Sequence, residues 1–163
     1  MDNMPDIKIH FIGSLQKNKV SMLVGVPQLT CIESVNSIAL ADVIQKELVR
    51  IGRKLDVMVE VNISEEESKS GIKKDCVYEL IEHIIKNCTQ LNFIGIMTIG
   101  EAGEGDRDFH EMANLAKEIK NKFSLDKIEL SMGMSADYEK AISCGATTVR
   151  IGSTIFGARV YKK

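Results

Sequence analysis

Short apolar strands alternate with amphipathic helices along nearly the whole chain, and few folds accommodate this rhythm. Six segments are predicted to be strands because apolar residues cluster or alternate in them; they span residues 8–13, 30–34, 55–62, 93–99, 128–133 and 147–152. A segment with apolar residues at helical spacing follows each strand. Such repeated units predict a parallel sheet with right-handed crossovers.

The predicted helices bury their apolar faces. They lie near residues 15–23, 41–51, 77–88, 106–123 and 136–143 and after residue 152. Three of these faces can be listed: Ala41, Ile44, Leu48 and Ile51; Val77, Leu80, Ile81, Ile84, Ile85 and Cys88; and Phe109, Met112, Ala113, Ala116, Ile119 and Phe123. Six units fit either an open α/β sheet or an arc of a (β/α)₈ barrel, and periodicity alone leaves both possible.

Composition limits the class of protein. The 163 residues, 44% of them apolar, predict a single domain over 1–163 with a sizeable core. A net charge of −2 does not indicate a nucleic-acid or membrane partner, and the apolar runs are too short to cross a bilayer. The opening MDNMPDIKIH does not resemble a signal peptide, so we expect a cytoplasmic protein.

The four cysteines are scattered as Cys31, Cys76, Cys88 and Cys144. There is no CxxC pair and no His/Cys cluster with zinc-ligand spacing, so the sequence predicts no metal site. Reduced thiols in the cytosol are the expected state.

Polar and small residues gather where the predicted strands end, and parallel folds of this kind bind ligands at that edge. The set is His10, Gly13, Ser34, Asn62, Ser64, Met97, Thr98, Met134, Ser135, Arg150, Gly152 and Ser153. It contains neither a Ser/His/Asp set nor a pair of carboxylates, so triad or acid–base chemistry is poorly supported.

Anion binding is better supported. The segment IGST, residues 151–154, offers backbone N–H groups and two hydroxyls at a helix start, and Ser135 stands at the start of the preceding helix. Helix N-termini attract phosphate through free N–H groups and the macrodipole. A cap for its own helix is the simpler role for Ser135 taken alone.

Arg150 is the sharper signal. It lies in a strand opposite in parity to Val149 and Ile151, which should face the helices, so its side chain should enter the interior. A buried guanidinium needs a partner. Either an ion pair with Glu129 or Glu60, or a ligand acceptor such as an unprotonated ring nitrogen, would provide one.

Four segments together resemble the pyridoxal phosphate homeostasis proteins, single-domain relatives of the alanine racemase barrel. They are IHFIGSLQKNK (9–19), VNISEEESKSGI (61–72), LSMGMSADYEKAI (130–142) and VRIGSTIFGAR (149–159), and they occur in the family's order. The resemblance implies a (β/α)₈ barrel of the alanine racemase N-terminal kind, here cut to about six units, that binds pyridoxal 5′-phosphate (PLP).

The resemblance also implies roles for individual residues. The phosphate would lie on Ser135, Gly152 and Ser153, beside Met134. Arg150 would donate to the pyridine nitrogen and weaken the cofactor as an electron sink. The remaining pocket residues implied less directly are His10, Asn62 and Met97.

The chain departs from the family in one respect. It starts at what resembles the third strand, and the family's Schiff-base lysine belongs to the first. We therefore expect a shortened barrel that binds PLP non-covalently. Lys17, Lys19 and Lys69 follow strands on the ligand side, where each is more simply a solvated surface lysine than a substitute anchor.

The function implied is non-catalytic PLP binding in vitamin B6 homeostasis. One alternative is a shortened barrel that no longer binds PLP and serves as an assembly or interaction protein. A lesser alternative is a racemase-like or decarboxylase-like enzyme, although those add a C-terminal β-domain. Because an arc of a barrel exposes two sheet edges, we also expect a homo-oligomer or pairing with a complementing N-terminal fragment.

Overall fold

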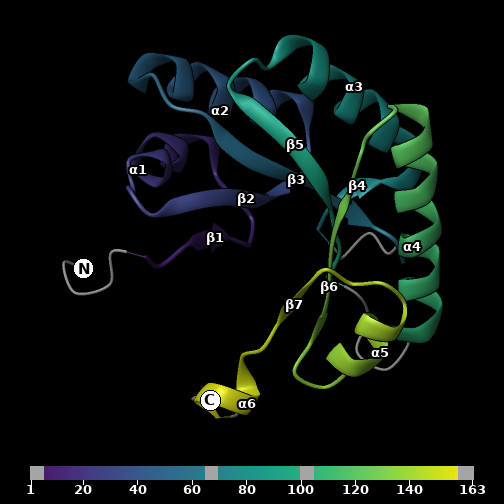
Figure 1. Ribbon diagram of the computed structural model, residues 1–163. Coiled ribbons are helices and arrows are strands. Elements are labelled where there is room, and N and C mark those ends of the chain that lie inside the picture. The colour runs from purple at the N-terminus through teal and green to yellow at the C-terminus, as the bar shows by residue number, and fades with distance from the viewer. Residues whose placement is uncertain (1–5, 65–69, 100–104, 158–163) are drawn as a thin grey trace.

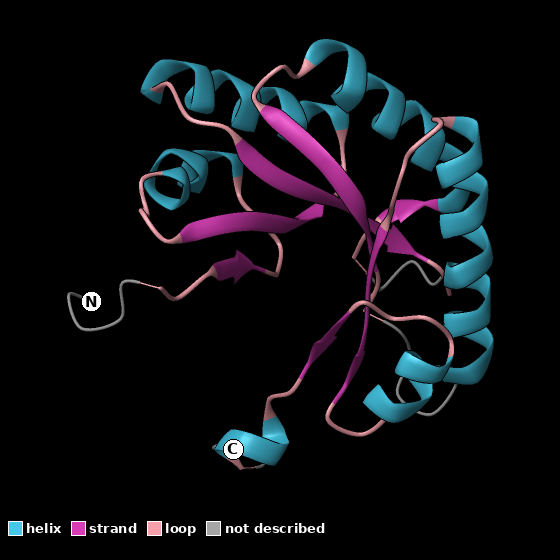
Figure 2. Cartoon of the chain, viewed as in Figure 1, coloured by secondary structure: helices cyan, strands magenta, loops and turns pink. Residues whose placement is uncertain are grey.

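The computed structural model describes residues 6–64, 70–99 and 105–157. Its strands form one curved parallel sheet (Figures 1 and 2). The sheet order is β1 (Ile9–Phe11), β2 (Leu29–Val35), β3 (Leu55–Asn62), β5 (Leu91–Met97), β6 (Glu129–Met134) and β7 (Thr148–Arg150), and β4 (Ile72–Lys73) pairs with β3 off this path.

Helices follow the strands, and the long helices lie along the outer side of the curve (Figure 2). They are η1 (Lys17–Lys19), α1 (Val20–Val24), α2 (Ile38–Ile51), η2 (Lys74–Cys76), α3 (Val77–Asn87), α4 (Gly105–Lys122), α5 (Tyr138–Ser143) and α6 (Ser153–Phe156). An open doubly wound sheet would carry helices on both faces. The arrangement is instead a half-barrel, which confirms the prediction of a shortened (β/α)₈ barrel.

The main core lies between the outer face of the sheet and the helices. On β3, Val57, Val59 and Val61 are at most 1% exposed and belong to the same apolar cluster as Ile44 of α2 and Leu80 of α3. Each such side chain contributes roughly 1.5–3 kcal/mol by leaving water. The predicted apolar faces of the helices therefore hold the helices onto the sheet.

The prediction of a core position is wrong for two residues. Ile51 is 39% exposed and Ile85 is 47% exposed. Ile51 is the last residue of α2, where Gly52 at φ 66° turns the chain away. Ile85 follows the fully buried Ile84 and is rotated about 100° from it around the helix, which carries it beyond the buried stripe.

Strand lengths also differ from the sequence prediction. The first strand, expected over 8–13, covers only Ile9–Phe11. The strand β4 was not predicted, because two residues are too few to show a period of two.

Among the described residues, no helix has the length and apolarity that a membrane crossing requires.

The concave face of the sheet is more polar than the outer face. Cys31, Met58 and Met97 form a small apolar cluster there. Among them stand buried polar residues, of which Glu33 and Glu60 are each 1% exposed and Ser131 is 0% exposed. Burial, and then the charges of Glu33 and Asp56, raise the pKa of the Cys31 thiol. This face is the inside of the barrel, and it leads to the functional site.

Gly133 shapes the end of β6. Its φ is 90°, and a Cβ there would stand 2.5 Å from the Cβ of Ala141 and 3.2 Å from the Cα of Tyr138. Only glycine combines this backbone conformation with such close packing on α5. The next residues, Met134 and Ser135, are thereby held at the carboxyl end of the sheet.

Candidate functional site

A groove of about 610 Å³ opens where β6 and β7 end. Its lining is Ile12, Ile99, Met134, Ser135, Ala136, Arg150, Gly152, Ser153, Phe156 and Gly157. Five of the residues predicted from the sequence are therefore brought together, namely Met134, Ser135, Arg150, Gly152 and Ser153. The volume lies within the roughly 300–1,000 Å³ typical of small-molecule sites.

Ser135 caps a different helix from the one expected. The N-cap of α5 is Asp137, whose Oδ1 accepts from the N–H of Met134 at 2.6 Å. The Oγ of Ser135 instead accepts from the N–H of Gly152 at 3.0 Å and of Thr154 at 3.4 Å, at the start of α6. Because both acceptor positions of the hydroxyl are used, its O–H proton is left to donate to another group.

The start of α6 has room for a ligand beside this hydroxyl. A Cβ placed on Gly152 would meet no atom within 4 Å, and both Gly152 and Ser153 are exposed in the groove. The donors here are two serine hydroxyls and the backbone N–H of Ser153, because the N–H groups of Gly152 and Thr154 already donate to Ser135. Hydroxyl and backbone N–H groups are the groups that hold phosphate in proteins. The donor set therefore fits a phosphate group.

Arg150 enters the concave side, as its strand parity predicted. Its neighbour Val149 lies on the other face, where its Cγ1 is 3.7 Å from the position of a Gly133 Cβ. The guanidinium donates from Nη1 to the Oγ of Ser131 at 3.0 Å and from Nη2 to the carbonyl oxygen of Thr98 at 2.8 Å. No further bond joins the remaining N–H groups to the described part of the chain, so they can donate to a ligand in the groove.

The expected ion pair of Arg150 with Glu129 or Glu60 is wrong. Glu129 lies 3.5 Å from the Nζ of Lys127, and Glu60 accepts from Ser70 at 2.6 Å. The error arises because Ser131 stands between the guanidinium and the nearest buried acid. Burial lowers the pKa of Arg150, and the charges of Glu33, Asp137 and Glu60 oppose that shift.

Glu33 is a buried acid behind Arg150 that the sequence prediction missed. Its Oε2 accepts from the Oγ of Ser131 at 2.6 Å, and its Oε1 lies 2.7 Å from the Nδ1 of His10. A continuous chain of polar contacts thus runs from β1 through Glu33 and Ser131 to Arg150 on β7. The signal in the sequence is a charged glutamate that shares its parity with Cys31 inside a short strand that carries no other charge.

Glu60 adds a second buried acid to the concave face. Its Oε1 is bonded to Ser70, whereas its Oε2 is fully buried and has no hydrogen-bond partner among the residues that the structure describes. Buried acceptors without a donor are rare because they are destabilising. Such an atom is expected in an interior that is built around a ligand and not packed as a closed core.

The other predicted site residues lie outside the lining of the groove. His10 lines a smaller cavity of about 340 Å³ with Lys8 and Thr148, toward the opposite end of the strands. Met97 is buried against Cys31 and Met58, and Asn62 is 8% exposed with its Oδ1 accepting from Ser64 at 3.3 Å. Their expected contacts with PLP stay predictions.

The candidate substitute lysines are resolved in part. Lys17 and Lys19 are exposed in η1, as a solvated surface lysine would be. Lys69 lies outside the described residues.

Known proteins share this sequence and fold. Residues 3–160 match the profile of the alanine racemase N-terminal domain. A human protein named pyridoxal phosphate homeostasis protein is 45% identical over 168 residues, which cover 98% of this chain and 61% of that protein. The protein of the same name from Aquifex aeolicus is 39% identical over 96% of this chain and 69% of its own length. The chain thus spans about 61% of the human relative's length.

Solved structures of other proteins share this fold. PipY of Synechococcus elongatus PCC7942, determined with PLP bound, superposes with a TM-score of 0.81 at 30% identity, over 96% of this chain and 73% of that one. An alanine racemase of Clostridium difficile superposes with a TM-score of 0.72 at 17% identity, over 97% of this chain and 41% of that one, a likeness of fold alone. With its half-barrel, its matching profile and these relatives, the chain belongs to the alanine racemase N-terminal domain family.

Proposed function

We propose that this chain binds PLP in the groove at the ends of β6 and β7, and that it acts in PLP homeostasis without catalysing a reaction. The observation that carries the proposal is the convergence of the Ser135 hydroxyl, the start of α6 and the Arg150 guanidinium on one groove. The names of the human and Aquifex relatives, and the PLP bound to PipY, support the same ligand.

Each of these residues would hold a different part of PLP. The hydroxyls of Ser135 and Ser153, with the backbone N–H of Ser153, would bind the phosphate, with Gly152 leaving room for it. Arg150 would donate to the pyridine nitrogen, held in place by Ser131 and the Thr98 carbonyl. Bound PLP withdraws electrons most strongly when its ring nitrogen is protonated, and a guanidinium that keeps its own proton leaves that nitrogen unprotonated.

A PLP titration followed by near-ultraviolet and visible absorbance tests binding. We expect saturable binding by the parent chain, and a loss of affinity of roughly tenfold or more in Ser135→Ala and in Arg150→Met, since charge-assisted hydrogen bonds contribute about 1.5–3 kcal/mol. Ser143→Ala is the matched control, because Ser143 is exposed at the end of α5 and outside the groove. Equal affinities in all four proteins would contradict the proposed site.

Borohydride reduction with peptide mass mapping tests the mode of binding. We expect PLP to be removable after reduction, because the proposed contacts are non-covalent. A reduced adduct on Lys17, Lys19 or Lys69 would overturn the non-covalent part of the proposal while leaving the groove in place. The lack of catalysis is tested by incubating the PLP-loaded chain with L-alanine in deuterated water, where no exchange of the α-proton is expected.

A second candidate function, as an interaction protein, rests on the rim of the groove. Ile12 is 36% exposed, Ile99 is 37% exposed and Phe156 is 86% exposed. Apolar side chains grouped in this way favour contact with another chain, whether a second copy or a complementing fragment. Light scattering after size-exclusion chromatography tests this, and a monomer at all concentrations with cooperative unfolding would contradict it.

The four free cysteines support a cytoplasmic location.

A further inference from the structure

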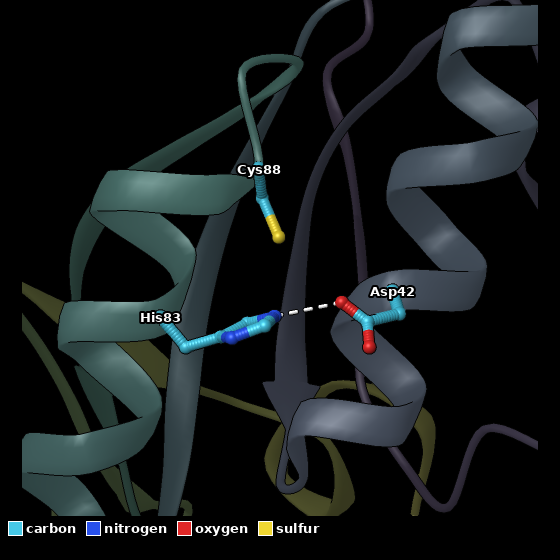
Figure 3. Close-up of side chains that lie close together, drawn as sticks. All are labelled: Asp42, His83 and Cys88. Carbon is cyan, nitrogen blue, oxygen red and sulfur yellow. Dashed lines mark hydrogen bonds and ion pairs between the residues drawn. The ribbon is translucent and has the colours of Figure 1, made fainter.

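A second cluster of chemically active side chains lies in the helical layer, on the other side of the sheet from the groove. Asp42 comes from α2, His83 comes from α3, and Cys88 caps the end of α3 (Figure 3). One ligand atom from each, a carboxylate oxygen, a ring nitrogen and the Sγ, lie within 4.8 Å of one another. The PLP groove uses none of these residues.

We propose that Asp42, His83 and Cys88 form a binding site for Zn²⁺ or a similar soft divalent ion. The side chains converge, since the His83 Nε2 lies 2.7 Å from the Asp42 Oδ1 and the Cys88 thiol points toward the same ring (Figure 3). Three protein ligands of these types, with a fourth position open to water, match the tetrahedral preference of zinc. Calcium and magnesium would prefer oxygen ligands alone.

The fold holds the cluster in place before any ion arrives. The side chain of Gln45, one turn after Asp42 on α2, donates to the Thr89 Oγ1 at 3.1 Å and accepts from the Gln90 N–H at 2.9 Å. These two residues directly follow Cys88. The turn that carries the thiol is therefore tied to the helix that carries the carboxylate, so little further ordering is needed when the ion binds.

An ion can reach the cluster from solvent. The side chain of Asp42 is 56% exposed and that of His83 is 21% exposed, while Cys88 is 2% exposed. The thiol forms the inner wall and the other two ligands form the mouth. Burial, and then the charge of Asp42, raise the pKa of the Cys88 thiol, so it is protonated at neutral pH. Formation of the sulfur–zinc bond would release that proton to solvent.

Asn87 is placed to set the tautomer of His83. Its Nδ2 lies 3.2 Å from the His83 Nδ1, so in this arrangement the Nε2–H donates to Asp42. An ion on Nε2 requires the proton on Nδ1 instead. A half-turn of the Asn87 amide would present its oxygen to that proton, and metal-bound histidines are commonly oriented by such a second hydrogen bond.

Titration of the PLP-free, reduced chain with Co²⁺ tests the site, because tetrahedral Co²⁺ bound to a thiolate absorbs strongly in the near ultraviolet. We expect one ion per chain, displacement by Zn²⁺ and release of one proton. Cys88→Ala should abolish the thiolate absorption. Asp42→Asn and His83→Gln should each weaken binding by more than about 100-fold, and Asn87→Ala by about 10–100-fold.

The chain offers a matched control in a second cysteine–histidine pair. Cys144 Sγ lies 3.9 Å from both ring nitrogens of His110, and this pair is outside the three-residue cluster. Cys144→Ala, and Cys76→Ser at an exposed thiol, should leave the Co²⁺ absorption unchanged.

Two results would overturn the proposal. One is an absorption band that survives Cys88→Ala or disappears in the control variants, and the other is no binding below millimolar Co²⁺. The substitution Asp42→Asn keeps the test valid if Cys88→Ala does not fold, because Asp42 is exposed on α2. Circular dichroism verifies that each variant retains its helices.

Discussion

The two faces of the sheet are built from the same strands but solve different problems. On β3, Val57 and Val59 face the helices, whereas Met58 and Glu60 face the inside of the barrel. The outer layer is a continuous apolar core. The inner layer holds Glu33, Ser131 and Arg150 in a chain of hydrogen bonds, although Glu33 and Ser131 are as buried as the valines.

This difference separates stability from binding. Apolar burial stabilises a fold without regard to direction, so the outer layer can be made from any side chains of suitable volume. Buried hydrogen bonds add little net stability but fix orientation, and each unpaired member is destabilising. The inner layer therefore holds Arg150 in one direction, toward the groove, while it adds little net stability to the fold.

The largest expected effect comes from the outer layer. Ile84→Ala removes a fully buried side chain of α3, and we expect it to lower the free energy of unfolding by about 2–5 kcal/mol. Ile85→Ala on the same helix is the control, with an expected loss below about 1 kcal/mol because Ile85 is 47% exposed. Urea denaturation measures both. Equal losses would show that the outer layer is not packed as described.

An intermediate effect is expected from the inner layer. Ser131→Ala removes the hydroxyl that joins Glu33 to Arg150, and we expect a loss of about 1–3 kcal/mol because both partners stay buried. Ser143→Ala removes an exposed hydroxyl bonded to the Lys140 carbonyl at 2.7 Å, and it should change stability by less than about 0.5 kcal/mol. A Ser131 variant as stable as the control would mean that the polar chain does not hold Arg150.

The smallest effect is expected at the outer surface, where polar contacts meet water. Tyr78 on α3 donates to the Glu118 Oε2 on α4 at 2.7 Å. Burial, then this hydrogen bond and the charge of Glu118, raise the pKa of Tyr78 to about 12. The fold thus favours the neutral phenol, so the contribution of Tyr78 to stability is complete below its ordinary pKa of about 10 and is lost as the pH rises through about 12.

Ultraviolet titration of the three tyrosines measures this effect. One phenol should ionise late, near pH 12, and it should be absent from the titration of Tyr78→Phe. Tyr138→Phe is the control. The Tyr138 hydroxyl makes an exposed contact with Glu139 Oε1 at 3.5 Å, which is long for a hydrogen bond. A late phenol that persists in Tyr78→Phe would contradict the assignment.

Local pattern in the sequence was enough to predict the six strand–helix units, the apolar faces of the long helices and the parity of Arg150. The reason is that each depends on periods of two or about 3.6 residues, which can be seen within one segment. The groove residues on β6, β7 and α6 could be predicted as well, because parallel strands bring their carboxyl ends to one edge. The exceptions, such as Ile51 and Ile85, lie where a helix ends or at the margin of its buried stripe.

Tertiary structure alone decided which polar groups meet. Glu33 and Ser131 are 98 positions apart, and Asp42 and His83 are 41 apart, so no spacing rule could join them. Ser135 could be identified as a capping residue, but the choice of α6 over α5 depends on how β6 and β7 lie side by side. Hydrogen bonds and metal ligands need positions accurate to a fraction of an ångström, and in this chain those positions are set by the packing of whole strands and helices against one another.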